Sequence, residues 1–163
     1  MSGSDNANPG IFISYGSLTQ NGLWKNLEFP YILNSFEITA NLTVENGSVL
    51  KMTPYALISI LNGGGLIMDG TQSAPITITS EKDTPLAGDW LEFDFFASSN
   101  NNNRFSHTNI MYGGGGGYGA VWIDDGAYLE LDHVTFSHNE TCDVSLYNIT
   151  DMSTSNSSYS VCN

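Results

Sequence analysis

Short apolar segments alternate with polar turns through the middle of the chain. Between Leu42 and Trp90 these segments are separated by Gly, Asn and Pro, and no window repeats apolar residues at the 3.6-residue spacing of a helix. In residues 76–80 (ITITS) isoleucine alternates with threonine, which is the two-residue period of a strand. The pattern predicts an all-β chain of short strands with one buried and one solvated face.

The same rule predicts strands elsewhere in the chain. Residues 11–15 form the first, and residues 23–33, from Leu23-Trp24 to the segment FPYIL, form the second. In residues 90–95 (WLEFDF) the alternation places Leu91 and the two phenylalanines on the buried face. Trp90 and the two acidic residues are then expected on the solvated face.

The spacing of similar segments indicates a repeat. Leu42 and Leu66 are 24 residues apart (66 − 42), and His107 and His133 are 26 apart (133 − 107), within segments of similar character. A recurrence of about 25 residues is typical of a solenoid, in which each turn covers the open edge of its neighbour. We therefore predict a parallel β-solenoid of about six rungs, with a core column roughly 30 Å long.

Composition and charge restrict the function. The 163 residues suit one domain, with residues 1–10 as a polar tail or cap and residues 11–163 as the solenoid domain. The net charge of −13, with only four basic residues, argues against nucleic acid as a partner. No apolar run reaches the length of a membrane span, so membrane insertion is not expected.

The two cysteines are predicted to form a disulfide. Cys142 and Cys162 are 20 residues apart (162 − 142) in a polar segment with few apolar anchors. A bridge would pin the C-terminal segment and stabilise the fold by roughly 3 kcal/mol. The alternative is two free thiols in a cytosolic protein, which the exposed-looking Ser, Thr and Asn surroundings disfavour.

Several motifs recur in a characteristic order. A strand that ends in a Gly turn at Leu42–Gly47 is followed by Gly64–Thr71 (G-x-L-x-x-x-G-T), Pro75–Ser80 (P-I-x-x-T-S) and Gly88–Trp90 (G-x-W). Over residues 22–137 this order resembles the right-handed parallel β-helix repeats of bacterial exported proteins, in the pectate-lyase-like superfamily. The resemblance implies a right-handed parallel β-helix, an extracellular or cell-surface location and use as a module of a longer protein. It implies no reaction, because that fold hosts lyases, hydrolases, adhesins and inert spacers.

The first functional hypothesis is a non-catalytic structural or adhesive module. Tyr112, Tyr118 and Trp122 are candidates for contact with a polysaccharide or cell-surface glycan, because aromatic faces stack on sugar rings. The glycine run 113–117 between them is either a flexible lip or, as we favour, a long turn between rungs without chemistry. The two open ends of a solenoid also predict head-to-tail or tail-donated self-association into an oligomer or fibre.

The alternative hypothesis is a polysaccharide-active enzyme, either a lyase or a hydrolase. Its carboxylate candidates are Asp124 and Asp132, with His133 nearby, since glycoside hydrolysis requires two carboxyl groups. Resemblance to pectate lyases would imply a basic catalytic residue, and Arg104 is the single arginine. We favour polar outward positions and histidines that make hydrogen bonds at rung corners, so no catalytic residue is assigned.

Three minor predictions concern ions, ice and an asparagine run. Calcium is the ion that the acidic composition suits, but no calcium-loop spacing is present and no metal ligand is assigned. Ice binding is a further alternative, and it would use outward threonines. Residues 100–103 are expected to form a solvated loop, with a ladder of stacked amides as the alternative. The aspartates considered for calcium are Asp89, Asp94, Asp124, Asp125 and Asp132. The threonines considered for ice binding are Thr39, Thr43, Thr77 and Thr79.

Overall fold

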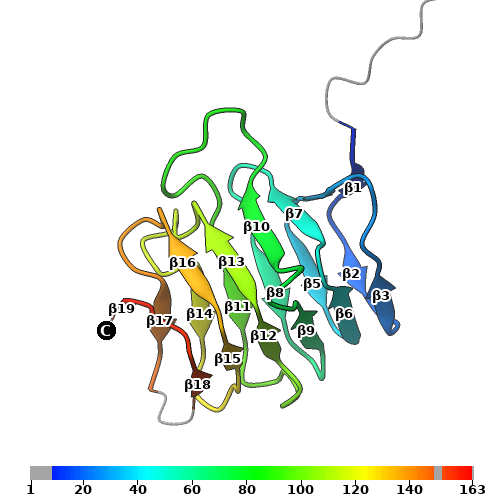
Figure 1. Ribbon diagram of the computed structural model, residues 1–163. Coiled ribbons are helices and arrows are strands. Elements are labelled where there is room, and N and C mark those ends of the chain that lie inside the picture. Colours follow the sequence, from blue (N-terminus) through cyan, green and yellow to red (C-terminus); the bar gives the residue numbers. More distant parts are fainter. Residues whose placement is uncertain (1–8, 149–151, 163) are drawn as a thin grey trace, which may run out of the picture.

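The strands follow one another around a coil in the computed structural model, which describes residues 9–148 and 152–162 (Figure 1). Each strand pairs in parallel with the strand one turn before it and the strand one turn after it. Helices are absent from the described residues, and three parallel sheets run along the coil. The fold is a parallel β-solenoid of about six turns, which confirms the prediction.

Six turns contribute one strand to each sheet, and β19 adds a seventh strand to the second sheet. The first sheet contains β1 (Ile11–Ile13), β4 (Tyr31–Leu33), β7 (Val49–Met52), β10 (Ile76–Ser80), β13 (Thr108–Met111) and β16 (Thr135–Ser137). The second sheet contains β2 (Ser17–Leu18), β5 (Phe36–Ile38), β8 (Ile58–Ile60), β11 (Phe93–Phe95), β14 (Val121–Ile123), β17 (Val144–Leu146) and β19 (Val161–Cys162). The third sheet contains β3 (Gly22–Trp24), β6 (Asn41–Glu45), β9 (Gly65–Asp69), β12 (Arg104–Ser106), β15 (Glu130–Asp132) and β18 (Ser153–Ser155).

The core is a column of inward side chains that stack from turn to turn. Leu42 pairs in register with Leu66, and both are buried, which confirms the repeat that their spacing predicted. In the middle of the column Phe105 packs edge-on against Phe93 and Phe95, at ring-centroid distances of 5.8 and 5.7 Å. Such edge-to-face contacts add about 0.5–1.5 kcal/mol each to the burial of the rings.

The turns differ in length, so the spacing of about 25 residues is an average. Ile11 and Tyr31 are partners 20 residues apart (31 − 11), whereas Ile78 and Ile110 are partners 32 apart (110 − 78). The additional residues lie in the connections, and residues 81–92 form a loop that extends beyond the strand ends (Figure 1). The strands themselves stay in register across these differences.

Two strand predictions were wrong. Residues 23–33 do not form one strand, because the chain turns a corner after Trp24 and β4 begins only at Tyr31, in a different sheet. Trp90 is fully buried instead of solvated, and its indole N–H donates to the Met111 carbonyl oxygen at 2.8 Å. Leu91 is only half-buried, because β11 starts at Phe93 and the strand alternation does not continue back through the preceding bend.

The two ends of the solenoid differ. The predicted disulfide between Cys142 and Cys162 is present, with Cα atoms 5.8 Å apart, and it ties β19 to the connection before β17. Most of the predicted N-terminal tail, residues 1–8, lies outside the described residues. At that end Phe12 and Leu23 are each about half exposed on the first turn.

The asparagine run is structural at two positions, which corrects the expectation of a solvated loop. Asn103 is 1% exposed, and its side-chain oxygen accepts a hydrogen bond from the Leu66 N–H at 2.8 Å. Its amide nitrogen donates to the carbonyl oxygens of Asn100 and Tyr128. Asn100 also donates to the side-chain oxygen of Asn41, which begins β6 two turns earlier, so side-chain amides link different turns of the coil.

Candidate functional site

A hollow of about 410 Å³ opens on the outer surface of the second sheet. Four aromatic residues and two acidic residues line it, and we call these six the aromatic hollow: Glu92, Asp94, Phe96, Tyr118, Trp122 and Tyr147. Clusters of this composition, with a few polar groups among aromatic rings, are typical of ligand sites.

Strand register brings the acid and the tryptophan together. Asp94 is the middle residue of β11, and it pairs with Trp122, the middle residue of β14. Because Phe93 and Phe95 are buried in the core, the residue between them must face outward. β17, the neighbour of β14, leads into Tyr147, whose N–H donates to the Ile123 carbonyl oxygen at 3.0 Å.

The aromatic rings form a partly exposed platform. The Trp122 ring lies 6.0 Å from Phe96 at an interplanar angle of 65°, and 6.3 Å from Tyr147 at 27°. Tyr118 and Tyr147 are 55% and 56% exposed, so their faces are accessible to a ligand. A flat apolar ring face matches the C–H face of a sugar ring.

The two acids are held in a setting that disfavours their charge. Burial, and then the charge of Asp94, raises the pKa of Glu92 to about 7. Burial, and then the charge of Asp124, raises the pKa of Asp94 to about 6. Near neutral pH the Glu92 carboxyl group is therefore protonated in a large fraction of molecules.

Both acids also have unsatisfied hydrogen-bonding capacity. Glu92 Oε2 and Asp94 Oδ1 are buried, and neither has a hydrogen-bond partner among the described residues. Such a group loses its interactions with water without replacing them, at a cost of about 1–3 kcal/mol. A ligand with hydroxyl donors would supply the missing partners once the two side chains turn these buried oxygens towards the hollow.

The glycine run supports the hollow from one side. A Cβ at Gly115 would lie 2.2 Å from the Gly88 carbonyl oxygen, and one at Gly113 would lie 2.6 Å from the Trp90 ring. Gly114 also has a positive φ of 88°, which favours glycine. The run is thus a closely packed turn, as favoured from the sequence, and it positions Tyr118 at the edge of the hollow.

The structure separates the residues proposed for glycan contact. Tyr118 and Trp122 both line the aromatic hollow. Tyr112 does not line it, because it packs partly buried against the core and stacks on His138 at 5.3 Å. Nothing in the sequence pointed to Tyr147, which reaches the hollow through the pairing of β17 with β14.

The residues proposed for catalysis also do not all lie together. Asp124 follows β14 and acts on the hollow through its charge on Asp94. Asp132 ends β15 in the third sheet, where it contacts His133 Nδ1 at 2.8 Å. Hydrogen bonds from Ser155 first, and then from His133, hold the pKa of Asp132 below its usual range. Asp124 and Asp132 therefore belong to different parts of the surface.

Glu92 was missed as a functional candidate. A partial signal was present, because Glu92 lies two residues before Asp94 and the two-residue period places both on one face. That period also predicted a solvated Glu92, which is wrong: Glu92 precedes β11 and is 9% exposed. What the sequence does not reveal is that this face is walled by aromatic rings from later turns. Burial beneath those rings turns an ordinary polar position into one with a raised pKa.

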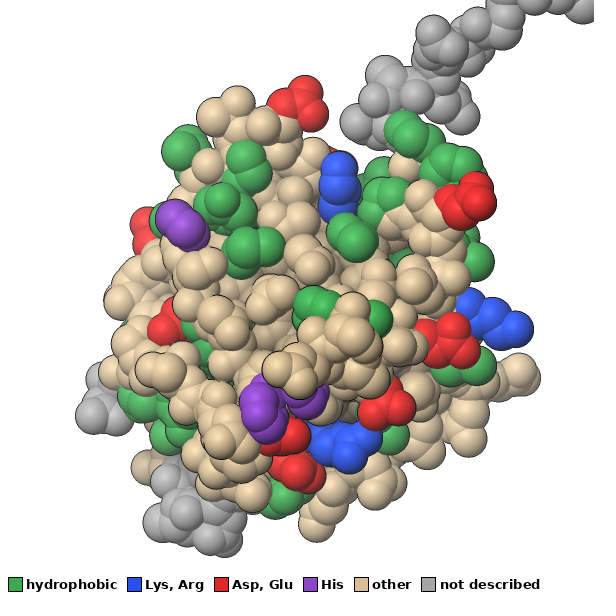
Figure 2. All heavy atoms as spheres, viewed as in Figure 1, with side chains coloured by type: hydrophobic (Ala, Val, Ile, Leu, Met, Phe, Trp, Pro, Cys, Tyr) green, Lys and Arg blue, Asp and Glu red, His purple; other side chains and the backbone are tan. Residues whose placement is uncertain are grey.

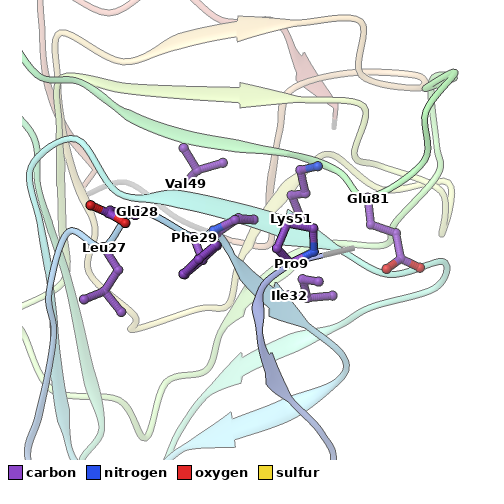
Figure 3. Close-up of a pocket in the computed structure, with 9 residues that line it drawn as sticks. Pro9, Leu27, Glu28, Phe29, Ile32, Val49, Lys51 and Glu81 are labelled. Carbon is purple, nitrogen blue, oxygen red and sulfur yellow. The ribbon is translucent and has the colours of Figure 1, made fainter. Parts of the chain in front are cut away.

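A second hollow, of about 260 Å³, lies on the first sheet near the N-terminal end (Figure 3). Its lining is mostly apolar and includes Leu27, Phe29 and Val49, and its charged members are Glu28, Lys51 and Glu81. Phe29 is the single aromatic ring in this lining. The second hollow thus lacks the aromatic platform of the first, and its two glutamates share the lining with a lysine.

The threonines proposed for ice binding do not form a row. Thr77 has Val49 and Asn109 as its strand neighbours, and Thr79 has Lys51. Thr43 lies in the third sheet. The flat threonine array that this alternative requires therefore has no support from the strand register.

The aspartates named for calcium are also dispersed. Asp89 is buried and pairs with Lys82, while Asp94 and Asp124 adjoin the aromatic hollow. Burial acts to raise the pKa of Asp89, but hydrogen bonds from Lys82 and from the Leu86 N–H outweigh it and lower that pKa. Asp89 thus holds the 81–92 loop, and calcium binding stays a prediction without a defined site.

Comparison with known proteins assigns no function: no family model, no curated protein and no solved structure matches the chain significantly. Among the described residues there is no helix of the length and hydrophobicity that crossing a membrane requires.

Proposed function

We propose that this protein is an extracellular, non-catalytic β-solenoid module of the pectate-lyase-like type that binds uncharged glycans in the aromatic hollow. The observation that carries the proposal is the pair of unsatisfied carboxyl oxygens, on Glu92 and Asp94, in a hollow walled by aromatic rings. Sugars offer both complementary features, since they have hydroxyl donors at their edges and C–H faces for stacking.

The charge of the protein favours an uncharged ligand. The net charge is −13, and both polar residues in the hollow are acids. A polyanionic glycan would be repelled by this field, and its own anionic groups have no hydrogen to donate to the carboxyl oxygens. A neutral or amino sugar donates hydrogen bonds to them at no such cost.

An extracellular location is supported by the disulfide between Cys142 and Cys162, since disulfides persist mainly in oxidising compartments. The motif order that resembles exported β-helix repeats supports the same location. An adhesive role follows if the module displays its outer surface to polysaccharides or cell-surface glycans.

The test is a glycan-array screen followed by titration calorimetry on the strongest uncharged ligand. Trp122→Ala is expected to weaken binding at least tenfold, because it removes the ring in the middle of the platform. Tyr55→Asn is the matched control: Tyr55 is 74% exposed and outside the hollow, and asparagine tolerates its positive φ of 62°. Absence of binding to any glycan, or equal binding by Trp122→Ala, would contradict the proposal.

Glycoside hydrolysis is the second candidate, and the raised pKa values of both acids favour it. Glycoside hydrolysis requires two carboxyl groups, and a carboxyl group with a raised pKa suits the role of the acid. Glu92 would then protonate the leaving oxygen, and Asp94 would act as the base or nucleophile. Turnover of a bound glycan that is lost in Glu92→Gln, and kept in the exposed neighbour variant Asp125→Asn, would replace the binding module by an enzyme.

A further inference from the structure

Two histidines occupy the same corner of successive turns. His107 lies between β12 and β13, and His133 lies between β15 and β16. The residues before them, Ser106 and Asp132, pair in register, so the two histidines follow in step. Their rings stack with centroids 4.4 Å apart and an interplanar angle of 4°.

Hydrogen bonds orient both rings. The Ser106 hydroxyl lies 3.1 Å from His107 Nδ1, and Asp132 Oδ1 lies 2.8 Å from His133 Nδ1. The Ser155 hydroxyl, one turn further along, donates to the same oxygen of Asp132. With Nδ1 of each ring engaged, the Nε2 atoms are left without a hydrogen bond within the described part of the chain. A histidine whose Nδ1–H is held by a carboxylate or hydroxyl presents the Nε2 lone pair that metal ions bind.

We propose that His107, Asp132 and His133 form a binding site for a divalent transition-metal ion of the Zn²⁺ or Cu²⁺ type. One ligand atom from each residue lies within 4.8 Å of the other two, which small side-chain rotations convert into a coordination sphere. Two imidazoles and one carboxylate suit these borderline ions, whereas calcium requires oxygen ligands throughout. Three protein ligands leave a further position for water or for a ligand of the metal.

Because the two imidazole rings are parallel, one of them must rotate before both can bind the same ion. A metal ion lies in the plane of each imidazole that binds it, so two parallel rings cannot both aim at one ion. One ring must tilt, and the His133 side chain has room for this because it is 48% exposed. Asp132, at 30% side-chain exposure, can follow it. The bound ion would join the corners of two successive turns.

The surroundings favour a cation. Histidine side chains gather beside acidic side chains on the face shown in Figure 2. Arg104 is the nearby basic group in the same strand as Ser106, and Asp69 neutralises it through a contact of 2.8 Å. The overall charge of −13 raises the local concentration of cations further.

The binding test uses tag-free protein titrated calorimetrically with ZnCl₂ alone and with CuCl₂ alone. One ion per chain is expected. His107→Asn and His133→Asn should each weaken binding at least tenfold, and Asp132→Asn should weaken it as well. Asparagine keeps the backbone, since the two histidines have positive φ values of 42° and 53° and asparagine tolerates this conformation.

The third histidine provides the matched control. His138 also has a positive φ, of 56°, but it stacks on Tyr112 away from the cluster. His138→Asn should therefore bind within twofold of the unsubstituted protein. An equal loss of affinity in His138→Asn, or unchanged affinity in both other histidine variants, would overturn the proposal.

Electron paramagnetic resonance of the Cu²⁺ complex tests the site without any variant. Hyperfine coupling to two imidazole nitrogens is expected, together with a Zn²⁺-dependent rise in melting temperature. A spectrum with fewer than two nitrogens, or no binding at millimolar metal, would overturn the proposal even if the variants failed to fold. Glycan binding in the aromatic hollow does not depend on either result.

Discussion

Asp94 and Trp122 are direct partners on neighbouring strands, with both side chains on the outer surface of the second sheet. The carboxyl group is partly buried beside Trp122, and Asp124 adds a like charge nearby. An acid in these surroundings favours its protonated form. The proposed glycan site depends on both residues: Trp122 supplies a ring face, and Asp94 supplies a carboxyl group with an unpaired oxygen.

The raised pKa of Glu92 predicts that the fold loses stability as the pH rises. Between the ordinary value of 4.5 and about 7, the folded protein binds more protons at this group than the unfolded protein does. The free energy of unfolding therefore falls across that interval, by about 1–2 kcal/mol after allowance for solvent screening.

Urea denaturation of the unsubstituted protein and of Glu92→Gln at pH 4.5 and pH 8 measures this effect. The variant lacks the titrating group. Its free energy of unfolding, relative to that of the unsubstituted protein, should therefore be higher at pH 8 than at pH 4.5. A difference between the two proteins that does not change with pH would contradict the raised pKa.

Two adjacent glycines should respond differently to alanine. Gly115→Ala places a Cβ 2.2 Å from the Gly88 carbonyl oxygen, and we expect a loss of about 1–3 kcal/mol in unfolding free energy. At Gly116 the nearest atom to a Cβ, Glu92 Oε2, is 3.5 Å away, so Gly116→Ala should be neutral or stabilising by up to about 1 kcal/mol. Equal effects in thermal or urea denaturation would contradict the close packing of this turn.

The asparagine run offers a similar comparison. Asn103→Ala leaves the buried Leu66 N–H without its partner, so we expect a loss of about 2–3 kcal/mol. Asn102 is exposed, and Asn102→Ala should change stability by less than about 0.5 kcal/mol. Amide hydrogen exchange at Leu66 provides a local readout, with faster exchange expected only in Asn103→Ala.

Removal of the disulfide should destabilise the C-terminal end. The bridge closes a loop of 20 residues, and replacing both Cys142 and Cys162 by serine should lower the unfolding free energy by about 3 kcal/mol. A reducing agent should reproduce this loss in the unsubstituted protein and have no effect on the double variant. Equal stability of both proteins under oxidising conditions would show that β19 is held by other contacts.

Self-association through the two ends of the solenoid stays a prediction. Its support is the first turn, where Phe12, Tyr15 and Leu23 are 57%, 75% and 51% exposed at the open edge of the three sheets. An edge strand with apolar side chains is a surface on which another chain can pair. Light scattering over a wide concentration range tests it, and a monomer throughout would contradict it.

The sequence by itself determined the class of fold and its period. Alternation in segments such as 76–80 requires strands with one buried face, and Gly and Asn at the turns allow the chain to change direction. The match of Leu42 with Leu66 could be predicted because a solenoid places residues one repeat apart side by side. The disulfide could also be predicted, because the chain contains only two cysteines.

Only the tertiary structure decided which residues form each site. Trp90 was expected outside and lies inside, because the chain bends before β11 and a period-two rule fails across a bend. Turns of unequal length set which residues of neighbouring strands are paired, and the stacking of turns brings Tyr147 and Glu92 to the same hollow from distant parts of the chain. The raised pKa of Glu92 and the stacking of His107 on His133 depend on burial and distance, which arise only after the turns have packed.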